Sequence, residues 1–235
     1  MKIELTKKPQ NVIILGGFPG FGLVGTISSE YLIDHLGAEK IGSVWFSEMN
    51  AMIAIHDSKI VEPFGIFYSK KYNLVIFHAI TNVAGMEWKI AVAMQDLATK
   101  LKAKEVLCIE GVGGMPGKKS TGKYYYYSNK NKTKWEKIGV ENMKEGIVVG
   151  PTASLMLKLK KFPLSCIFAE TASNLPDSRA AANIIKVLDS YLGLKVDYKP
   201  LLKKATVFEG KLKGILEGAK RVKLDKEKKE ISYMG

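Results

Sequence analysis

The sequence predicts an α/β layered fold in a single domain with a mixed sheet. Short β-rich runs alternate with segments of helical period along most of the chain, which is the pattern of helices packed on a sheet. The 235 residues are 46% hydrophobic, enough to bury a substantial core. We place the domain at residues 1–222, with an inserted hairpin at 123–138, and expect residues 223–235 to form a flexible charged tail.

The expected strands are short runs rich in apolar and β-branched residues. In chain order they are residues 12–15, 41–46, 52–56, 65–69, 74–80, 105–110 and 166–169. Residues 74–80 and 105–110 flank a helical segment at the spacing of a right-handed crossover, which predicts parallel pairing. Between residues 52 and 69 the strands are too close for intervening helices, so that part of the sheet is expected to be antiparallel.

The expected helices have apolar residues at helical spacing and cover residues 23–36, 85–101, 152–160, 178–192 and 198–223. Residues 123–128 and 133–138 are separated by a polar turn at 129–132, which predicts a projecting hairpin. The tyrosines at 124–127 alternate in direction along a strand, so one pair would pack inward. Aromatic side chains on both faces of such a hairpin favour a protein interface over base stacking beside a basic rim.

The net charge of +13 is concentrated in two segments. Residues 118–137 contribute +6 and residues 201–235 contribute +5, almost all of it from lysine. The chain has only two arginines, Arg179 and Arg221, whereas base and phosphate recognition commonly uses the guanidinium group. The excess charge therefore indicates a solvated lysine surface, and the charge distribution argues against nucleic-acid binding.

The N-terminal segment has none of the features expected of a secretory signal or a membrane helix. The first ten residues include Lys2, Glu4, Lys7 and Lys8 and contain no apolar core, which argues against a secretory signal. The long uncharged run at residues 9–29 contains five glycines and Pro19, which argues against a membrane helix. We expect a cytoplasmic protein with no membrane partner.

A glycine-rich turn follows the strand expected at residues 12–15. Its distinctive residues are Gly17, Phe18, Pro19, Gly20, Gly22 and Gly25. The last three glycines match the dinucleotide fingerprint, which also needs an acidic residue at the end of the second strand. Glu39 and Glu48 are poorly placed for that role, so we interpret the turn as a structural strand-to-helix connection and expect no cofactor. Its two phenylalanines either pack on the core or offer an apolar contact surface, and core packing is favoured.

The sequence offers few groups for catalysis. The three histidines, His35, His56 and His78, are far apart in the sequence and lack the spacing of metal ligands. The two cysteines, Cys108 and Cys166, lie in apolar runs, which is typical of inert core thiols. Four acids fall near predicted strand ends, where α/β proteins gather active-site groups: Glu48, Glu110, Glu170 and Asp177. No nucleophile-elbow motif accompanies them, so we assign no catalytic residue and no metal site.

Several motifs together resemble the proteasome assembly chaperone 2 family in its archaeal form. They are the residues 18–25 after an N-terminal strand, Glu62-Pro63, Glu170-Thr171 with Pro176-Asp177 and the alanines 180–182, and residues 192–197. The resemblance runs from about Val12 to Ala205. It implies a three-layer α/β/α fold similar to the phosphorylase/hydrolase class. It also implies a homo-oligomer without established catalytic activity that contacts proteasome α subunits, assisting ring assembly or acting as an ATP-independent activator.

The resemblance also directs attention to the C-terminus, where members dock through a hydrophobic-tyrosine ending. This chain ends in Ile231, Ser232, Tyr233, Met234 and Gly235, so its tyrosine lies one place further from the carboxylate than the family pattern has it. A charged stalk carrying this apolar tip could reach a distant pocket, and several copies on an oligomer would raise its effective concentration. An ordinary frayed terminus is the alternative.

Two functions follow. The first is a non-catalytic proteasome assembly chaperone that binds α subunits with Ile231, Tyr233, Met234 and Gly235. The alternative is a nucleosidase-, phosphorylase- or hydrolase-type enzyme with Glu110, Glu170 or Asp177 in a strand-end pocket and a glycine turn that binds an anion.

Overall fold

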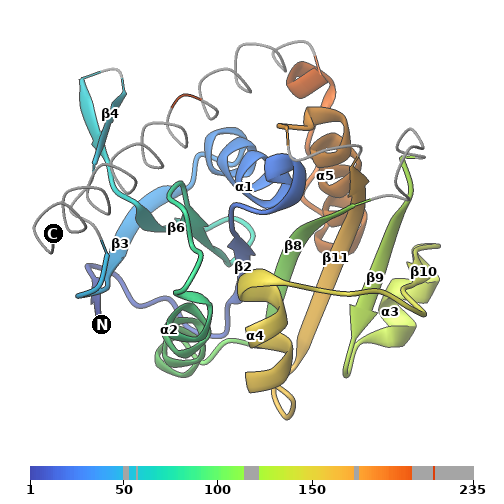
Figure 1. Cartoon of the computed structure of the whole chain (residues 1–235), viewed down its shortest axis with the longest axis horizontal. Helices are drawn as coiled ribbons and strands as arrows, with labels where there is room; N and C mark the ends of the chain where they lie inside the picture. Colours follow the sequence, from blue (N-terminus) through green and yellow to red (C-terminus); the bar gives the residue numbers. More distant parts are fainter. Residues whose placement is uncertain (50–52, 57, 114–121, 172–174, 203–213, 215–235) are drawn as a thin grey trace, which may run out of the picture.

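A computed structural model of the chain shows a nine-stranded sheet with helices on both faces (Figure 1). The structure describes residues 1–49, 53–56, 58–113, 122–171, 175–202 and 214. In chain order, the strands of the sheet are β1 (Lys2–Leu5), β2 (Ile13–Gly17), β3 (Glu39–Trp45), β6 (Phe64–Ser69), β7 (Leu74–Ala79), β8 (Glu105–Gly113), β9 (Tyr124–Ser128), β10 (Glu141–Asn142) and β11 (Leu164–Thr171). A separate two-stranded ribbon, β4 (Ala54–His56) with β5 (Lys59–Val61), projects from one end of the molecule (Figure 1).

The strand order is β1-β3-β6-β7-β2-β8-β11-β9-β10. The four central strands, β7, β2, β8 and β11, are parallel, whereas β6 and β9 pair with them antiparallel on either side. The sheet is therefore mixed, as predicted. The expected direct pairing of residues 74–80 with 105–110 is wrong, because β2 lies between β7 and β8 and pairs with both. Four of the five residues of β2 are buried, as is typical of a central parallel strand whose sheet is covered on both faces.

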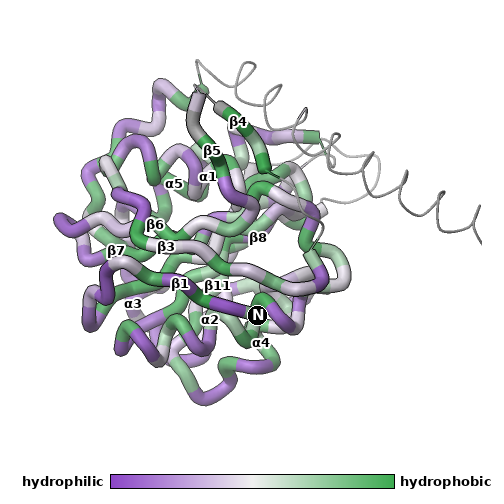
Figure 2. The backbone as a smooth tube through the Cα atoms, turned by 90° about the vertical axis from the view of Figure 1, so that its left-hand side faces the viewer, coloured by the Kyte–Doolittle hydropathy of each residue, from purple (hydrophilic) through white to green (hydrophobic). Residues whose placement is uncertain are grey.

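Alternate residues of the central strands face two separate cores. Val106 and Cys108 of β8 face the core under α2 (Glu87–Lys100) and α4 (Gly150–Lys158). Leu107 and Ile109 face the opposite core, under α1 (Val24–His35), α5 (Ser178–Leu192) and the short α3 (Lys132–Lys137). This is the three-layer α/β/α arrangement that the family resemblance implies. The tube view turned by 90° shows hydrophobic segments along the strands and hydrophilic ones around the periphery (Figure 2).

Most predicted elements are present with small shifts at their ends. The four helices α1, α2, α4 and α5 correspond to predicted ones, and α5 has the predicted bounds. The Asp177 side chain accepts a hydrogen bond from the Ala180 N–H and so caps α5, which Gly193 ends in a left-handed conformation. The strands β1, β5 and β10 are additional. Of the helix expected at 198–223, residues 199–202 are helical and most of the remainder lies outside the described residues.

The predicted hairpin at residues 123–138 is wrong. Its first half is β9, an interior strand between β11 and β10, and its second half is the helix α3. Trp135 and Ile138, three residues apart, share one side of this turn, and Trp135 is completely buried against Tyr126 and Tyr191. As predicted, the tyrosines alternate: Tyr126 is buried in the core, whereas Tyr127 is exposed.

Candidate functional site

The carboxyl ends of the four parallel strands meet at one edge of the sheet, where α/β proteins commonly place their binding sites. The glycine-rich turn follows β2 at this edge, and the ends of β8 and β11 lie beside it. The turn contains a short 3-10 segment, Phe21–Leu23, before α1 begins. It lies beside two of the four acids that the sequence places near strand ends, Glu110 and Asp177.

The glycines of the turn lie where neighbouring groups leave no room for a side chain. A Cβ atom would lie 2.1 Å from Ser29 Oγ if added at Gly17, and 2.6 Å from the Phe18 carbonyl oxygen if added at Gly25. Gly22 has a φ of +61°, and its carbonyl accepts a hydrogen bond of 2.8 Å from the Asp177 N–H. The turn is thus closed against its own helix and against the start of α5.

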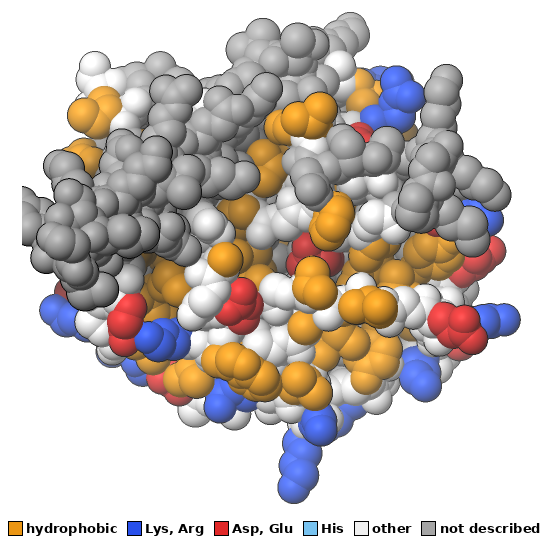
Figure 3. All heavy atoms as spheres, in the orientation of Figure 1, with side chains coloured by type: hydrophobic (Ala, Val, Ile, Leu, Met, Phe, Trp, Pro, Cys, Tyr) orange, Lys and Arg blue, Asp and Glu red, His pale blue; other side chains and the backbone are white. Residues whose placement is uncertain are grey.

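The two phenylalanines of the turn have different environments. Phe18 is buried and packs edge-to-face on Phe77 with ring centroids 5.7 Å apart, so it belongs to the core. Phe21 is 38% exposed. Other large apolar side chains exposed near the helix N-termini of this edge are Trp88, Ile147 and Val149. The front of the molecule accordingly shows hydrophobic side chains gathered around its centre (Figure 3).

Geometry argues against a dinucleotide at the matching glycines. A Cβ at Gly20 would lie 2.0 Å from Oε1 of Glu110, so a carboxyl group occupies the space beside the turn where a pyrophosphate would approach. The strand after the turn, β3, is separated from β2 by β6 and β7, so neither Glu39 nor Glu48 lies at the neighbouring strand. Glu48 instead forms an exposed ion pair of 2.6 Å with Lys89, which holds the pKa of its carboxyl low, at about 2.

Glu110 is a buried acid. Its Oε2 accepts a hydrogen bond of 2.9 Å from the Thr152 hydroxyl in the first turn of α4. Burial raises the pKa of this carboxyl to about 8, and the Thr152 hydrogen bond opposes only part of that rise. Glu110 therefore links the end of β8 to α4 and to the glycine turn.

A second buried constellation was not predicted. His78 of β7 has its Nδ1 2.7 Å from Ser29 Oγ and its Nε2 2.8 Å from Oε2 of Glu30. A serine, a histidine and a carboxylate that contact one another in this order form the arrangement of a nucleophilic relay. Here, however, Ser29 is completely buried and also donates a hydrogen bond to the Gly25 carbonyl. The group clamps α1 onto β7. The sequence could not reveal it, because Ser29 and His78 are 49 positions apart.

The structure also brings the two cysteines together. Cys108 and Cys166 are register partners on β8 and β11, and both are buried as free thiols. Their contact, together with burial, raises the pKa of the Cys166 thiol well above its usual value, and both thiols lie in the apolar core, as the sequence predicts. Within the described part of the chain, the side chains of His, Cys, Asp and Glu form no group of three placed to hold a metal. None of the described helices is both long and apolar enough to cross a bilayer.

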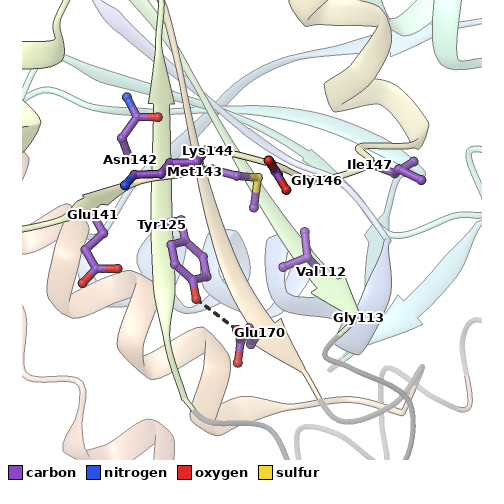
Figure 4. Close-up of a pocket in the computed structure, with 11 residues that line it drawn as sticks. Val112, Gly113, Tyr125, Glu141, Asn142, Met143, Lys144, Gly146, Ile147 and Glu170 are labelled. Atoms are coloured by element: carbon purple, nitrogen blue, oxygen red, sulfur yellow. Dashed lines mark hydrogen bonds between the residues drawn. The ribbon is translucent and has the colours of Figure 1, made fainter.

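A cavity of about 670 Å³ opens beside the ends of β8, β9 and β11 (Figure 4). Its lining includes Glu170, and the Tyr125 hydroxyl donates a hydrogen bond of 3.1 Å to Oε1 of that carboxylate. Among the three acids proposed for a strand-end pocket, only Glu170 lines this cavity; Glu110 is buried beside the glycine turn and Asp177 caps α5. The C-terminal candidates Ile231, Tyr233, Met234 and Gly235 lie outside the described residues.

These features define a three-layer α/β/α protein with a mixed sheet, a closed glycine turn and one strand-end cavity among its described residues. The chain belongs to the PAC2 family, whose model matches residues 14–216. It is 27% identical to an uncharacterised protein of Methanocaldococcus jannaschii, over 88% of this chain and 87% of that protein.

Solved structures agree with this family assignment. The chain is similar to Pyrococcus furiosus PbaA, described as an archaeal homolog of proteasome-assembly chaperone, with 27% identity and a TM-score of 0.83 over 94% of this chain and all of that one. Pyrococcus furiosus PbaB, described as an archaeal proteasome activator, has the same fold with a TM-score of 0.75 at 22% identity, over 91% of this chain and 98% of that one. The fold and the family predicted from the sequence are thereby confirmed.

Proposed function

We propose that this protein is a non-catalytic, homo-oligomeric chaperone-type protein of the cytoplasm that binds proteasome α subunits. The observation that carries the proposal is membership of the PAC2 family together with a fold like that of PbaA over nearly the whole chain. The contacts of two candidate catalytic acids support a non-catalytic role. Glu110 is buried and accepts a hydrogen bond from Thr152, and Asp177 caps α5. The binding element is the C-terminal tip, with Ile231, Tyr233, Met234 and Gly235.

Co-sedimentation with proteasome α-ring particles tests the tail. A chain truncated after Lys229 should lose co-sedimentation and keep its own oligomeric state, because the truncation removes only the tip. A full-length chain with Lys228→Gln and Lys229→Gln is the matched control: it alters the stalk but keeps the tip, and we expect it to bind. Undiminished co-sedimentation of the truncated chain would contradict the role of the tail.

Two further measurements separate the two roles of such a binder. An assembly chaperone should accelerate ring formation from dissociated α subunits. An activator should instead raise peptide hydrolysis by the finished particle without ATP. If the chain binds neither free subunits nor the particle, the proposed function is wrong.

The enzyme alternative makes a different prediction. A nucleosidase or phosphorylase should be stabilised by its nucleoside or phosphate ligands, and the shift in melting temperature should grow with ligand concentration. We expect no such shift, because three of the four charged residues in the strand-end cavity are acidic.

A further inference from the structure

The strand-end cavity exists because one face of the sheet is only partly covered by helices. On that face α2 and α4 cover the central strands. Over β11 and β9 the covering element is instead the extended chain that follows β10 and crosses to α4 (Figure 1). Residues 141–147 of this segment and the ends of the strands enclose about 670 Å³, within the range of small-molecule sites.

Strand register places the key side chains in two neighbouring rows on one face of the sheet. Glu141 of β10 is the partner of Tyr125 in β9, and Glu170 of β11 is the partner of Val112 in β8. Tyr125 and Glu170 are joined by their hydrogen bond of 3.1 Å, so β9 and β11 meet within the cavity. Tyr125 itself pairs with Phe168, so its row lies two residues from the row of Glu170 and Val112, and the hydrogen bond bridges the two rows (Figure 4).

The charge of this cavity is opposite to that of the protein. Its lining has three glutamates, at 141, 145 and 170, and one lysine, Lys144, in a chain with a net charge of +13. Partial burial, the hydrogen bond to Glu170 and the negative charges of Glu170 and Glu141 raise the pKa of the Tyr125 phenol. Such a site repels phosphates and carboxylates and attracts cations.

The other lining residues are Asn142, two glycines and three apolar side chains. Val112 and Met143 face each other across the cavity, and Ile147 stands at its mouth with 89% of its surface exposed (Figure 4). A strongly hydrated metal ion gains nothing from such walls, whereas a hydrocarbon chain buries surface on them. An aromatic ring beside carboxylates also suits an organic cation, which is attracted to the face of the ring.

We propose that this cavity binds an alkylammonium group, with the ammonium between the carboxylates of Glu170 and Glu141 beside the Tyr125 ring and the alkyl chain against Val112, Met143 and Ile147. The group can belong to a free diamine or to a lysine side chain of another protein. The lining of this cavity includes no residue of the C-terminal tip, so the two proposed sites can be tested by separate substitutions.

Calorimetric titration of the full chain tests this site with two probes, 1,5-diaminopentane and N-acetyl-lysine methylamide, and with 1-pentanol as the uncharged control. We expect both amines to bind better than the alcohol. Stronger binding of the diamine would identify a free amine as the source, and stronger binding of the lysine amide a protein side chain. Dissociation constants weaker than about 10 mM for both amines, or equal binding of the alcohol, would overturn the proposal.

Three variants locate the binding. Glu170→Gln should weaken binding at least tenfold, whereas Glu4→Gln, the same charge change on the opposite edge strand β1, should leave it unchanged. Tyr125→Leu should also weaken binding, because the ring is lost. Circular dichroism confirms that each variant is folded. Equal affinities of Glu170→Gln and Glu4→Gln would show that the amines bind elsewhere and would overturn the site.

Discussion

Gly111 lies in β8 beneath the glycine turn, where the backbone of another segment passes over it. A Cβ at this position would lie 2.0 Å from the carbonyl oxygen of Phe21. Because that oxygen belongs to the backbone, no side-chain rotation can relieve the overlap. At the residue scale, then, the turn is held by glycines in two elements, and Gly111 belongs to the strand rather than to the turn itself.

Gly111→Ala should lower the free energy of unfolding by about 2–3 kcal/mol, because the turn must move away from β8. The matched control is Gly113→Ala on the same strand. Among the described residues, a Cβ there would meet the Phe21 ring at 3.7 Å, an ordinary contact, so we expect a change within about 0.5 kcal/mol. Chemical denaturation of both variants measures the difference, and similar stabilities would contradict this account of the turn.

The buried Glu110 should make the stability of the protein depend on pH. Burial raises its pKa from 4.5 to about 8, so between these values the folded protein holds a proton that the unfolded chain has released. The unfolded state is therefore favoured as pH rises, and stability falls by about 1.4 kcal/mol per pH unit at most across that window. Below pH 4.5 the carboxyl is protonated in both states and contributes no pH dependence.

Glu110→Gln removes this proton and keeps the shape of the side chain. The stability of the variant relative to the native chain should rise steadily from pH 5 to pH 8. Denaturation midpoints at pH 5, 6.5 and 8 measure that difference, in which the titration of all other groups cancels. A difference that does not change with pH would show that Glu110 is not protonated in the folded protein.

At the scale of elements, the segment at residues 123–138 shows how a local pattern was misleading. Two β-rich runs around a polar turn predict a hairpin, but the second run forms α3. The Trp135 indole donates a hydrogen bond of 3.0 Å to Ser165 Oγ and stacks on Tyr191 with ring centroids 3.8 Å apart. Ser165 and Tyr191 also bond to the buried carboxylate of Glu105. These partners come from β11, α5 and β8, so the local sequence contains no trace of them.

Trp135→Ala should therefore destabilise the protein by about 3–5 kcal/mol, because it empties a fully buried site and leaves Ser165 without this donor. Trp88→Ala is the control, since Trp88 is 58% exposed in the first turn of α2 and should change stability by about 0.5 kcal/mol or less. Thermal or chemical unfolding measures both variants. If residues 123–138 were a projecting hairpin, the two substitutions would lower the free energy of unfolding by similar amounts.

At the scale of the whole molecule, the carboxyl edge combines exposed apolar side chains with an acidic cavity, in a protein that is strongly basic overall. Exposed groups of this kind mark interaction surfaces. The cavity and the C-terminal tip are the two contact sites that we propose for this protein, and they share no residue.

The whole-molecule prediction concerns oligomeric state. One chain has a mass of 26.0 kDa, and we expect light scattering to give an integral multiple of that mass. Truncation after Lys229 should preserve the multiple, because we assign the tip to partner binding and not to self-association. A mass of 26.0 kDa at every concentration would contradict the homo-oligomer and, with it, the gain in effective concentration expected for several tails.

The sequence by itself determined the fold class, the bounds of α5, the presence of most strands and the family. The elements depend on the spacing of apolar residues, and the family on the motifs that carry the resemblance, all of which are local along the chain. The tertiary structure alone decided that β2 separates β7 from β8, that α3 replaces a hairpin strand, and that Glu170 meets Tyr125 while Glu110 is buried against Gly20. The physical reason is that strand order and the burial of a charged group depend on contacts between residues far apart in sequence, which no local pattern encodes.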